Sequence, residues 1–372
     1  MEKGTKMVQS AIDNKSILIT GGTGSWGNEL TSQLLTKYCP KSIIIFSRGE
    51  QKQVEMRRKI HDTRVKYVIG DIRDKDRLRL ITKEVDTIFH LAALKHVPVC
   101  EENAWETVQT NVIGIQNLID AAIENGVERV IDISTDKAVD PFNLYGVTKA
   151  CGEKLMIAAN LIGNKTKFAC IRGGNVLGTT GSVVPLFRSQ ILERNEITIT
   201  DPTMTRFFMK VQDAIGLVLY ATEQAAGGEI FVMKMSSVTI ENLAQVMINN
   251  LGNSNTKITI TGIRPGEKLS EVLVSKYEIP RTLDTDQYYI ILPQLNITAI
   301  EKRYGKNPTN VCTLNEYSST NSTTYSKSEL TSLLMSDGWL DHNERIEPLV
   351  EPSPNIAKTQ LTLAKALASK NP

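Results

Sequence analysis

The sequence lacks most of the features on which secreted, metal-binding or membrane-spanning proteins depend. Its five cysteines are scattered and show no C-x-x-C spacing, which argues against a disulfide framework and against a zinc or other metal site. No uninterrupted apolar run approaches the roughly 18 residues of a membrane span. The polar segment 1–15 contains no apolar core of a signal peptide. We therefore expect a reduced, cytoplasmic protein without a membrane span.

The sequence also lacks an excess of positive or negative residues. The 372 residues carry 43 lysines and arginines against 41 aspartates and glutamates, for a formal net charge of +2. This balance gives no support to a nucleic-acid or anionic-membrane partner, so an anionic ligand must be held by local groups. The chain is long enough to bury a large core in one domain or two.

Short, continuous apolar runs alternate with helical patterns over the first half of the chain. This alternation predicts an α/β fold in which a doubly wound parallel sheet, of the Rossmann type, is covered on both faces by helices. The predicted strands of this sheet are 16–20, 42–46, 65–71, 86–95 and 129–135, followed by 168–178. A long helical stretch is expected at 104–125.

After about residue 170 the pattern changes to loops punctuated by proline and glycine. Helices are expected near 212–225 and 239–251, with strands at 229–234 and at the start of 257–268. We interpret this half as a smaller substrate-binding lobe, partly interleaved with the sheet. The predicted divisions are a polar lead (1–15), a cofactor domain (16–175), a substrate lobe (176–300) and a C-terminal extension (301–372). The extension contains a Ser/Thr-rich linker at 315–327 and a terminal helix at 351–372.

A glycine-rich loop follows the first predicted strand directly. Gly21, Gly24 and Gly27 are spaced for a tight turn and for close approach of backbone N–H groups to a pyrophosphate at the start of a helix. The alternative is a plain turn that ends a strand, but the strand–loop–helix context favours a dinucleotide. The candidate cofactor residues here are Gly21, Thr23, Gly24, Ser25, Trp26 and Gly27.

The end of the second predicted strand favours NADP over NAD. An NAD site usually has an acidic residue there to bind the ribose 2′-hydroxyl. This chain has Ser47, Arg48 and Lys52, and an arginine fork suits a 2′-phosphate. A solvated basic loop, or Glu50 on a ribose hydroxyl, stays open as an alternative. Further cofactor candidates at the ends of the third and fourth strands are Asp71, Ile72, Leu91, Ala92 and Ala93.

Tyr145 and Lys149 have the i, i+4 spacing that places two side chains on one face of a helix. A lysine ammonium beside a phenol favours the phenolate, so we expect it to lower the tyrosine pKa toward working pH. Tyr145 can then accept a proton from a sugar hydroxyl during oxidation of that carbon. Ser134 and Thr135, at the end of the preceding strand, are placed to orient the same oxygen.

Asp136 and Lys137 add an acid and an amine that hydride transfer alone does not need. Oxidation of a sugar at C4 makes the C5 hydrogen acidic. A partly neutral Lys137 can remove that proton, and a protonated Asp136 can donate to the departing C6 hydroxyl. The pattern thus predicts a dehydration in which the hydride returns to C6. The alternative is a surface ion pair that caps a turn before Pro141.

At these residues the sequence resembles a known family. The segments ITGGTGSWG, FSRGEQKQ, STDKAVDPFNLYGVTKACGEKL, GGNVLGTTGSVVPLF, TITDPTMTRFFM and TGIRPGEK are similar to those of UDP-N-acetylglucosamine 4,6-dehydratases. These are extended short-chain dehydrogenase/reductases of bacterial surface-sugar pathways. The similarity runs from about residue 12 to about residue 290.

The resemblance implies roles for matching positions. Asp136 is the acid, Lys137 the C5 base and Tyr145 the C4 base, with Thr135 on O4 and Lys149 on the cofactor ribose and the tyrosine. The implied substrate-binding residues, which approach the sugar or hold the diphosphate and the uridine, are Lys95, Asn175, Val183, Pro185, Arg206, Arg264 and Glu267. The resemblance also implies a homo-oligomer, a dimer or a larger ring.

The tyrosine of NLYG is similar to that of family members that also invert C5, the first step toward pseudaminic acid, whereas some relatives have methionine there. We therefore expect inversion, with retention as the alternative. Trp26 departs from the family, which usually has a smaller residue at this point of the cofactor loop. Two other readings stay open: a UDP-sugar 4-epimerase that uses Tyr145 without Asp136 and Lys137, and an NADP-binding protein without activity.

Overall fold

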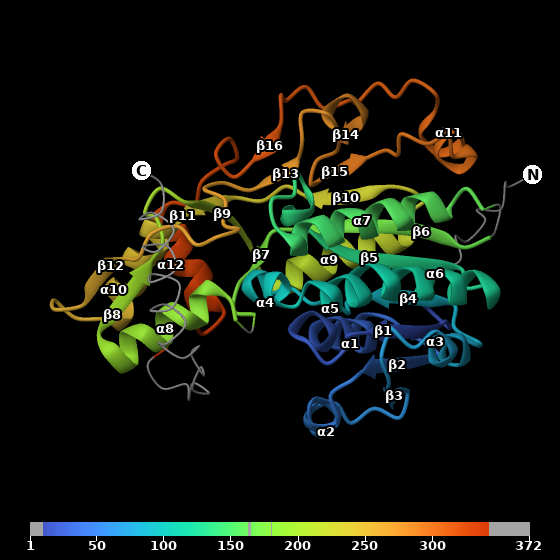
Figure 1. The fold of residues 1–372 in the computed structure, drawn as a ribbon, viewed down its shortest axis with the longest axis horizontal. Helices are drawn as coiled ribbons and strands as arrows, with labels where there is room; N and C mark the ends of the chain where they lie inside the picture. Colours follow the sequence, from blue (N-terminus) through green and yellow to red (C-terminus); the bar gives the residue numbers. More distant parts are fainter. Residues whose placement is uncertain (1–9, 163–164, 180, 342–372) are drawn as a thin grey trace, which may run out of the picture.

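The computed structural model describes residues 10–162, 165–179 and 181–341. Within these residues a nine-stranded sheet has the order β14-β15-β10-β6-β5-β4-β1-β2-β3 (Figure 1). Its strands are β1 (Ser16–Thr20), β2 (Ser42–Ser47), β3 (Val65–Ile69), β4 (Thr87–His90), β5 (Arg129–Thr135), β6 (Lys167–Gly173), β10 (Ile230–Met233), β14 (Thr282–Asp284) and β15 (Tyr288–Ile291). The strands from β3 to β10 pair in parallel, and β15 and β14 join antiparallel. The predicted α/β fold with a doubly wound parallel sheet is confirmed.

Helices pack in two groups against the sheet. Helix α1 contacts α9, whereas α3 contacts α6, and α6 contacts α7. Their bounds are α1 (Ser25–Lys37), α2 (Glu50–Lys59), α3 (Lys75–Ile81), α4 (Val97–Glu102), α5 (Ala104–Val108), α6 (Gly114–Glu124), α7 (Leu144–Ala159) and α9 (Val211–Gln224). A π-helical segment, Gln109–Ile113, joins α5 to α6, so the predicted helical stretch 104–125 has an irregular middle.

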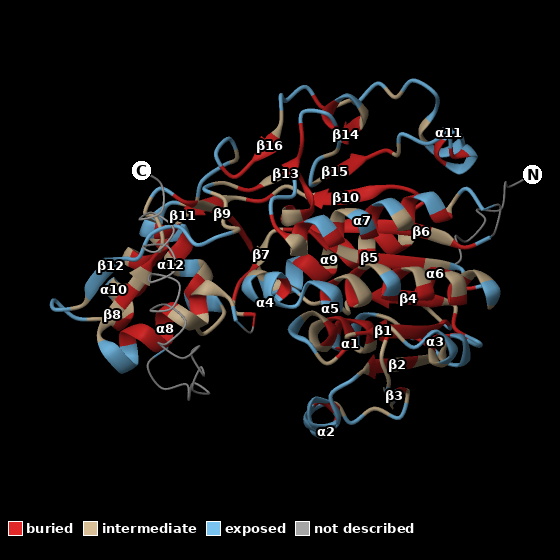
Figure 2. Ribbon diagram, viewed as in Figure 1, coloured by how far each residue is buried: buried red, intermediate tan, exposed pale blue. Residues whose placement is uncertain are grey.

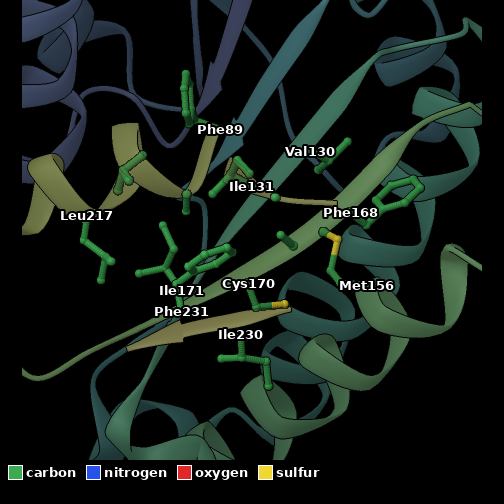
Figure 3. Packing of buried hydrophobic residues seen from close by; sticks show 14 of the residues in the cluster. Phe89, Val130, Ile131, Met156, Phe168, Cys170, Ile171, Leu217, Ile230 and Phe231 are labelled. Carbon is green, nitrogen blue, oxygen red and sulfur yellow. The ribbon is translucent and has the colours of Figure 1, made fainter. Parts of the chain in front are cut away.

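The apolar runs become strands because the sheet buries both faces. All five residues of β1 are buried, and the middle strands are buried along most of their length (Figure 2). Figure 3 shows the packing at close range, with side chains of β5 and β6 lying between Leu217 of α9 and Met156 of α7.

A second core lies in the lobe built mostly from the second half of the chain (Figure 1). Phe187, Leu243 and Leu330 are buried in it, and each comes from a different helix. The elements of this part are β7 (Asn175–Val176), α8 (Val183–Arg194), β8 (Glu196–Ile199), β9 (Thr205–Met209), β11 (Ser237–Thr239), α10 (Ile240–Leu251), β12 (Lys257–Ile260) and α12 (Lys327–Ser336). Between or beside the two cores lie β13 (Val272–Val274), α11 (Thr298–Tyr304) and β16 (Tyr317–Ser318), with 3₁₀ turns at Asp136–Ala138 and Ile279–Arg281.

Two of the predicted elements differ in detail from those in the structure. The run 168–178 is not one strand, because it breaks at Gly174 into β6 and β7, which belong to different sheets. The Ser/Thr-rich stretch 315–327 is not a loop throughout, since Tyr317 and Ser318 pair with β13 as β16 and are buried. The phenol of Tyr317 donates to the Met235 carbonyl, and this contact anchors the stretch to the main core. The predicted terminal helix at 351–372 lies outside the described residues.

Candidate active site

A cleft of about 1030 Å³ opens where the carboxyl ends of the parallel strands meet the lobe. This is the edge at which doubly wound sheets bind nucleotides. The lining includes the predicted cofactor residues Gly21, Thr23, Gly24, Ser25, Trp26, Gly27, Ser47, Arg48, Lys52, Asp71, Ile72, Leu91, Ala92 and Ala93. It also includes Lys95, Thr135, Lys137, Tyr145, Asn175, Val183, Arg206, Arg264 and Glu267.

Three predicted residues are not among those that line the cleft. Asp136 and Lys149 lie directly behind the lining, buried against Lys137 and Asp132 respectively. Pro185 lies on α8 and does not line the cleft.

The glycine loop makes the close approaches that its spacing predicts. Gly21 has φ +65°, and a Cβ there would lie 2.8 Å from the backbone of Ala92 on the loop after β4. A Cβ on Gly27 would lie 2.1 Å from the Gly22 carbonyl oxygen. No side chain caps the start of α1, and its first turn contains no acidic residue. The loop therefore leaves helical N–H groups for an anion, and these residues fit the pyrophosphate of a dinucleotide.

Trp26 extends from the first turn of α1 toward the end of β6. Its ring lies 3.4 Å from the position of a Cβ on Gly173. The residue that departs from the family pattern therefore lines the cleft beside a glycine that leaves room for the indole.

Basic side chains line the cleft at the end of β2. The Arg48 side chain is 56% exposed, and its Nη1 lies 4.0 Å from Oδ2 of Asp71. The Ser47 hydroxyl accepts from the Gln53 amide at 3.0 Å. Asp71 is itself held by Arg73, whose Nη2 lies 2.7 Å from Oδ2. The exposed guanidinium of Arg48 can therefore turn to a phosphate without breaking a buried pair.

Tyr145 lies in the first turn of α7, which begins at a side-chain cap. Asn143 Oδ1 accepts from the Gly146 N–H at 2.8 Å, and the Asn143 amide donates to the Gly266 carbonyl at 2.9 Å. This residue thus ties the tyrosine turn to the loop that carries Arg264 and Glu267. Sequence reasoning missed Asn143, although an asparagine just before a helix is a recognisable cap signal.

Lys149 is buried one turn further along α7. Its Nζ lies 3.3 Å from each carboxylate oxygen of Asp132, a fully buried residue of β5. Burial raises the pKa of Tyr145, and the nearby charges of Lys149 and Lys137 only partly oppose this effect. The expectation of a lowered tyrosine pKa is therefore wrong for the ligand-free protein, because loss of solvent outweighs the lysine charge.

Asp136 and Lys137 form a tight pair in the 3₁₀ turn after β5. Lys137 Nζ lies 3.0 Å from Asp136 Oδ1, and the Thr135 hydroxyl donates to the same oxygen at 2.8 Å. Asp136 is 1% exposed, which excludes the alternative of a surface ion pair. The second carboxylate oxygen, Asp136 Oδ2, is buried and has no hydrogen-bond partner among the described residues.

Lys137 has a second carboxylate that sequence reasoning missed. Glu271 Oε1 lies 3.5 Å from Lys137 Nζ, and the Glu271 side chain is 3% exposed. Burial opposes the charge of Lys137, but Asp136 and Glu271 outweigh it and raise the lysine pKa. These surroundings therefore favour a charged Lys137 over the partly neutral amine on which its role as a base depends. No local pattern marks Glu271, which follows the RPGEK segment and reaches the lysine only through the tertiary fold.

Arg206 binds groups of the protein itself, whereas the resemblance implies that it binds a diphosphate. Its guanidinium donates to the carbonyls of Thr205 and Lys268, each at 2.8 Å, and Nε lies 3.6 Å from Glu271 Oε1. Lys268 in turn donates to the carbonyls of Val139 and Asp140. These contacts connect the Arg264–Glu267 loop to the segment between Lys137 and Tyr145.

Comparisons with known proteins agree with this geometry. The family model of the polysaccharide biosynthesis proteins matches residues 17–293. The chain belongs to this family. The resemblance found in the motifs is confirmed.

Two relatives are named for different reactions. A UDP-N-acetylglucosamine 4,6-dehydratase (inverting) of Campylobacter jejuni is 46% identical over 298 residues, or 79% of this chain and 88% of the relative. A UDP-glucose 4-epimerase of Rickettsia bellii is 42% identical over 327 residues, or 87% of this chain and 96% of the relative.

Solved structures share the fold. Pen from Bacillus thuringiensis is 37% identical, with a TM-score of 0.80 and coverage of 87% of this chain and 99% of that chain. The dTDP-glucose 4,6-dehydratase DesIV of Streptomyces venezuelae, solved with NAD bound, is 21% identical, with a TM-score of 0.66 and coverage of 88% and 97%. No described helix is long and apolar enough to cross a membrane.

Proposed function

We propose that this protein catalyses NADP-dependent 4,6-dehydration of UDP-N-acetylglucosamine to a UDP-4-keto-6-deoxy sugar. The observation that carries the proposal is the pairing of the buried Asp136 with Lys137, 3.0 Å apart, beside Thr135 and Tyr145 at the cleft. An enzyme that only oxidises and reduces one carbon needs no such pair. The identity to the inverting dehydratase of Campylobacter jejuni supports the same conclusion.

The pair can provide an acid and a base when one proton moves between its two members. Transfer of one proton from Lys137 Nζ to Asp136 Oδ1 converts the ion pair into a neutral amine and a carboxylic acid. Thr135 orients O4, and Tyr145 accepts the O4 proton. Lys137 then accepts the C5 proton, and Asp136 donates to the departing O6 so that water leaves. Bound NADP would supply the oxidation at C4 and the matching reduction at C6. One proton must then add to C5 of the resulting enolate, so that the net change is the loss of one water.

NADP rather than NAD is proposed from the end of β2. Ser47, Arg48 and Lys52 line the cleft there, and the acidic lining residue nearest to them, Asp71, is paired with Arg73. A 2′-phosphate gains charge-assisted hydrogen bonds from such a set, whereas a 2′-hydroxyl gains less.

We propose that the substrate binds on the side of the cleft that the lobe forms. Arg264 and Glu267 are proposed to hold the diphosphate and a uridine hydroxyl, and they line the cleft together with Lys95 and Asn175. Val183 and Pro185 belong to the segment proposed to hold the uracil. Arg206, bound to backbone carbonyls, is proposed to shape the diphosphate site and to contact the ligand when it is bound. The division of the chain predicted from the sequence is kept in this proposal: residues 16–175 hold the cofactor, residues 176–300 hold the substrate, and residues 301–372 are a C-terminal extension.

Inversion at C5 is proposed from Tyr145, which the dehydratases that invert share. The product would then be a UDP-2-acetamido-2,6-dideoxy-L-arabino-hexos-4-ulose, the kind of precursor from which pseudaminic acid is made. We place the reaction in the cytoplasm, in keeping with the five cysteines, all of which are free.

The direct test is incubation with UDP-N-acetylglucosamine in deuterated water. Mass spectrometry should show loss of one water, and NMR should show deuterium at C5 with inverted configuration. Lys137→Ala should abolish the C5 exchange, because it removes the base, while Lys154→Ala, an exposed lysine of α7, should leave it unchanged. Full turnover by Lys137→Ala would contradict the assigned base.

A UDP-sugar 4-epimerase is the second candidate, favoured by the relative from Rickettsia bellii. Epimerisation uses Tyr145 and the cofactor and conserves mass, so a product of unchanged mass would select it. Bound NADP with no turnover of any UDP-sugar would instead support a protein without activity.

A further inference from the structure

Glu271 is a buried carboxylate that faces the cleft but has no role in the function proposed above. It is 2% exposed and immediately precedes β13. Its N–H donates to the Ser319 hydroxyl at 2.9 Å, and its carbonyl accepts from the Ser319 N–H at 2.8 Å. The neighbouring segment at β16 therefore fixes the backbone from which the side chain projects.

The two oxygens of this carboxylate differ in their surroundings. Oε1 lies 3.5 Å from Lys137 Nζ and 3.6 Å from Arg206 Nε. Oε2 is buried and has no hydrogen-bond partner within the described part of the chain, although Glu271 lines the cleft. A buried oxygen without a partner is costly, so its position at a ligand cleft points to a donor on the ligand.

The charge of Lys137 is balanced by groups from several elements. Asp136, from its own turn, and Glu271, beside β13, favour the ammonium, whereas Arg206 of β9 opposes it. Tyr145 of α7 is the other titratable group that faces the amine, and Lys268 acts on Glu271 from the adjoining loop. Glu271 is thus the one member of this set that favours the ammonium from outside the catalytic turn.

Building on the proposed dehydration, we propose that Glu271 is a positioning residue that orients the Lys137 amine and keeps it charged until the sugar is in place. A sugar hydroxyl that donates to Oε2 weakens the attraction of the carboxylate for the amine. One proton then passes from Lys137 Nζ to Asp136 Oδ1, which breaks an N–H bond and forms an O–H bond. The base and the acid are therefore produced together, in the presence of substrate.

The test measures the charge of Lys137 directly, without using turnover. Acetic anhydride reacts only with the neutral amine, so brief acylation at pH 8, read by peptide mass spectrometry, reports the neutral fraction. An opposite charge at this distance changes a pKa by about 1–3. Glu271→Gln should therefore raise the acylation rate of Lys137 by about tenfold or more, relative to exposed Lys276 as an internal reference.

Ser319→Ala is the matched control, because it removes one of the two hydrogen bonds to the Glu271 backbone, keeps the bond from the residue 319 N–H to the Glu271 carbonyl, and leaves the charge in place. It should leave the acylation rate unchanged. An unchanged or lower rate in Glu271→Gln, or an equal rise in Ser319→Ala, would overturn the proposal. If Glu271→Gln does not fold, Glu271→Asp keeps the charge on a shorter side chain and should give a smaller rise in the acylation rate. An acylation rate equal to that of the wild type would then contradict the proposal.

Activity is a separate arm of the experiment. If C5 exchange requires the neutral amine, the rising limb of its pH profile should move to lower pH in Glu271→Gln. Failure of the wild-type protein to release water from UDP-N-acetylglucosamine would refute the proposed function. The acylation result would then still decide whether Glu271 controls the charge of Lys137.

Discussion

Lys137 illustrates how much one residue depends on neighbours that are distant in sequence. Its adjacent partner, Asp136, is visible in the sequence, whereas Glu271 reaches it from 134 positions along the chain. The sequence predicts the type of chemistry at this position. The protonation state follows from burial and from two carboxylates, which only the fold brings together.

The proposed preference for NADP over NAD can be tested at Arg48. Arg48→Ala should weaken NADP binding by about tenfold, because it removes a charge-assisted hydrogen bond worth about 1.5 kcal/mol, and should leave NAD binding nearly unchanged. Isothermal titration calorimetry with both dinucleotides measures this difference. Arg58→Ala, on the exposed side of α2, removes the same charge and should affect neither cofactor. Equal losses for NADP and NAD would show that Arg48 does not contact the 2′-phosphate.

At the level of elements, the strands were predicted well where the signal is local. The predicted run 16–20 is β1 to the residue, and 129–135 is β5. The end of 86–95 was predicted less well, since β4 stops at His90 and the next residues form a loop that lines the cleft. A strand end depends on where pairing with its neighbours stops, and that information is not in the run itself.

Strand β4 also carries a pH-sensitive residue. His90 is 1% exposed, and its Nδ1 lies 2.7 Å from the Thr20 hydroxyl. Burial lowers the pKa of His90 from 6.5 to about 4. Between these values the unfolded chain binds a proton that the folded protein does not. The free energy of unfolding should therefore fall by up to about 3 kcal/mol as pH drops from 6.5 to 4.

Urea denaturation over this pH range measures the effect. His90→Asn keeps a polar partner for Thr20 and cannot titrate, so its stability should change less between pH 6.5 and 4. Glu278, whose pKa beside Arg172 is lowered to about 2 despite burial, adds a separate loss at lower pH that both proteins share. Parallel curves for the two proteins above pH 4 would contradict the assignment to His90.

At the scale of the whole molecule, exposed apolar side chains on neighbouring elements favour the homo-oligomer implied by the resemblance. Helices α4 and α5 and the π-helical segment all contact α7. Large apolar side chains are exposed on these elements and on the turn that precedes α7: Val99, Trp105, Ile113, Phe142 and Val147. Grouped apolar side chains of this kind mark an interaction surface, and we propose a second copy of the chain as the partner.

Trp105, which is 63% exposed, provides the test. Trp105→Glu places a charge in the proposed interface and should convert the protein to a monomer in light scattering at micromolar concentration. Tyr277→Glu introduces the same charge at a 71% exposed aromatic outside this face and should leave the mass unchanged. A wild-type protein that is already monomeric would refute the proposal.

The sequence by itself determined the sheet, the glycine loop and the residue types of the turn after β5, because each depends on short-range periodicity or on spacing within a few residues. Only the tertiary structure decided that Glu271 lies beside Lys137, that Asp132 pairs with the buried Lys149 and that Arg206 holds a loop. It also placed Tyr317 in a core rather than in a linker. These outcomes depend on burial and on contacts between distant segments, and both arise only once the two cores have closed around the cleft.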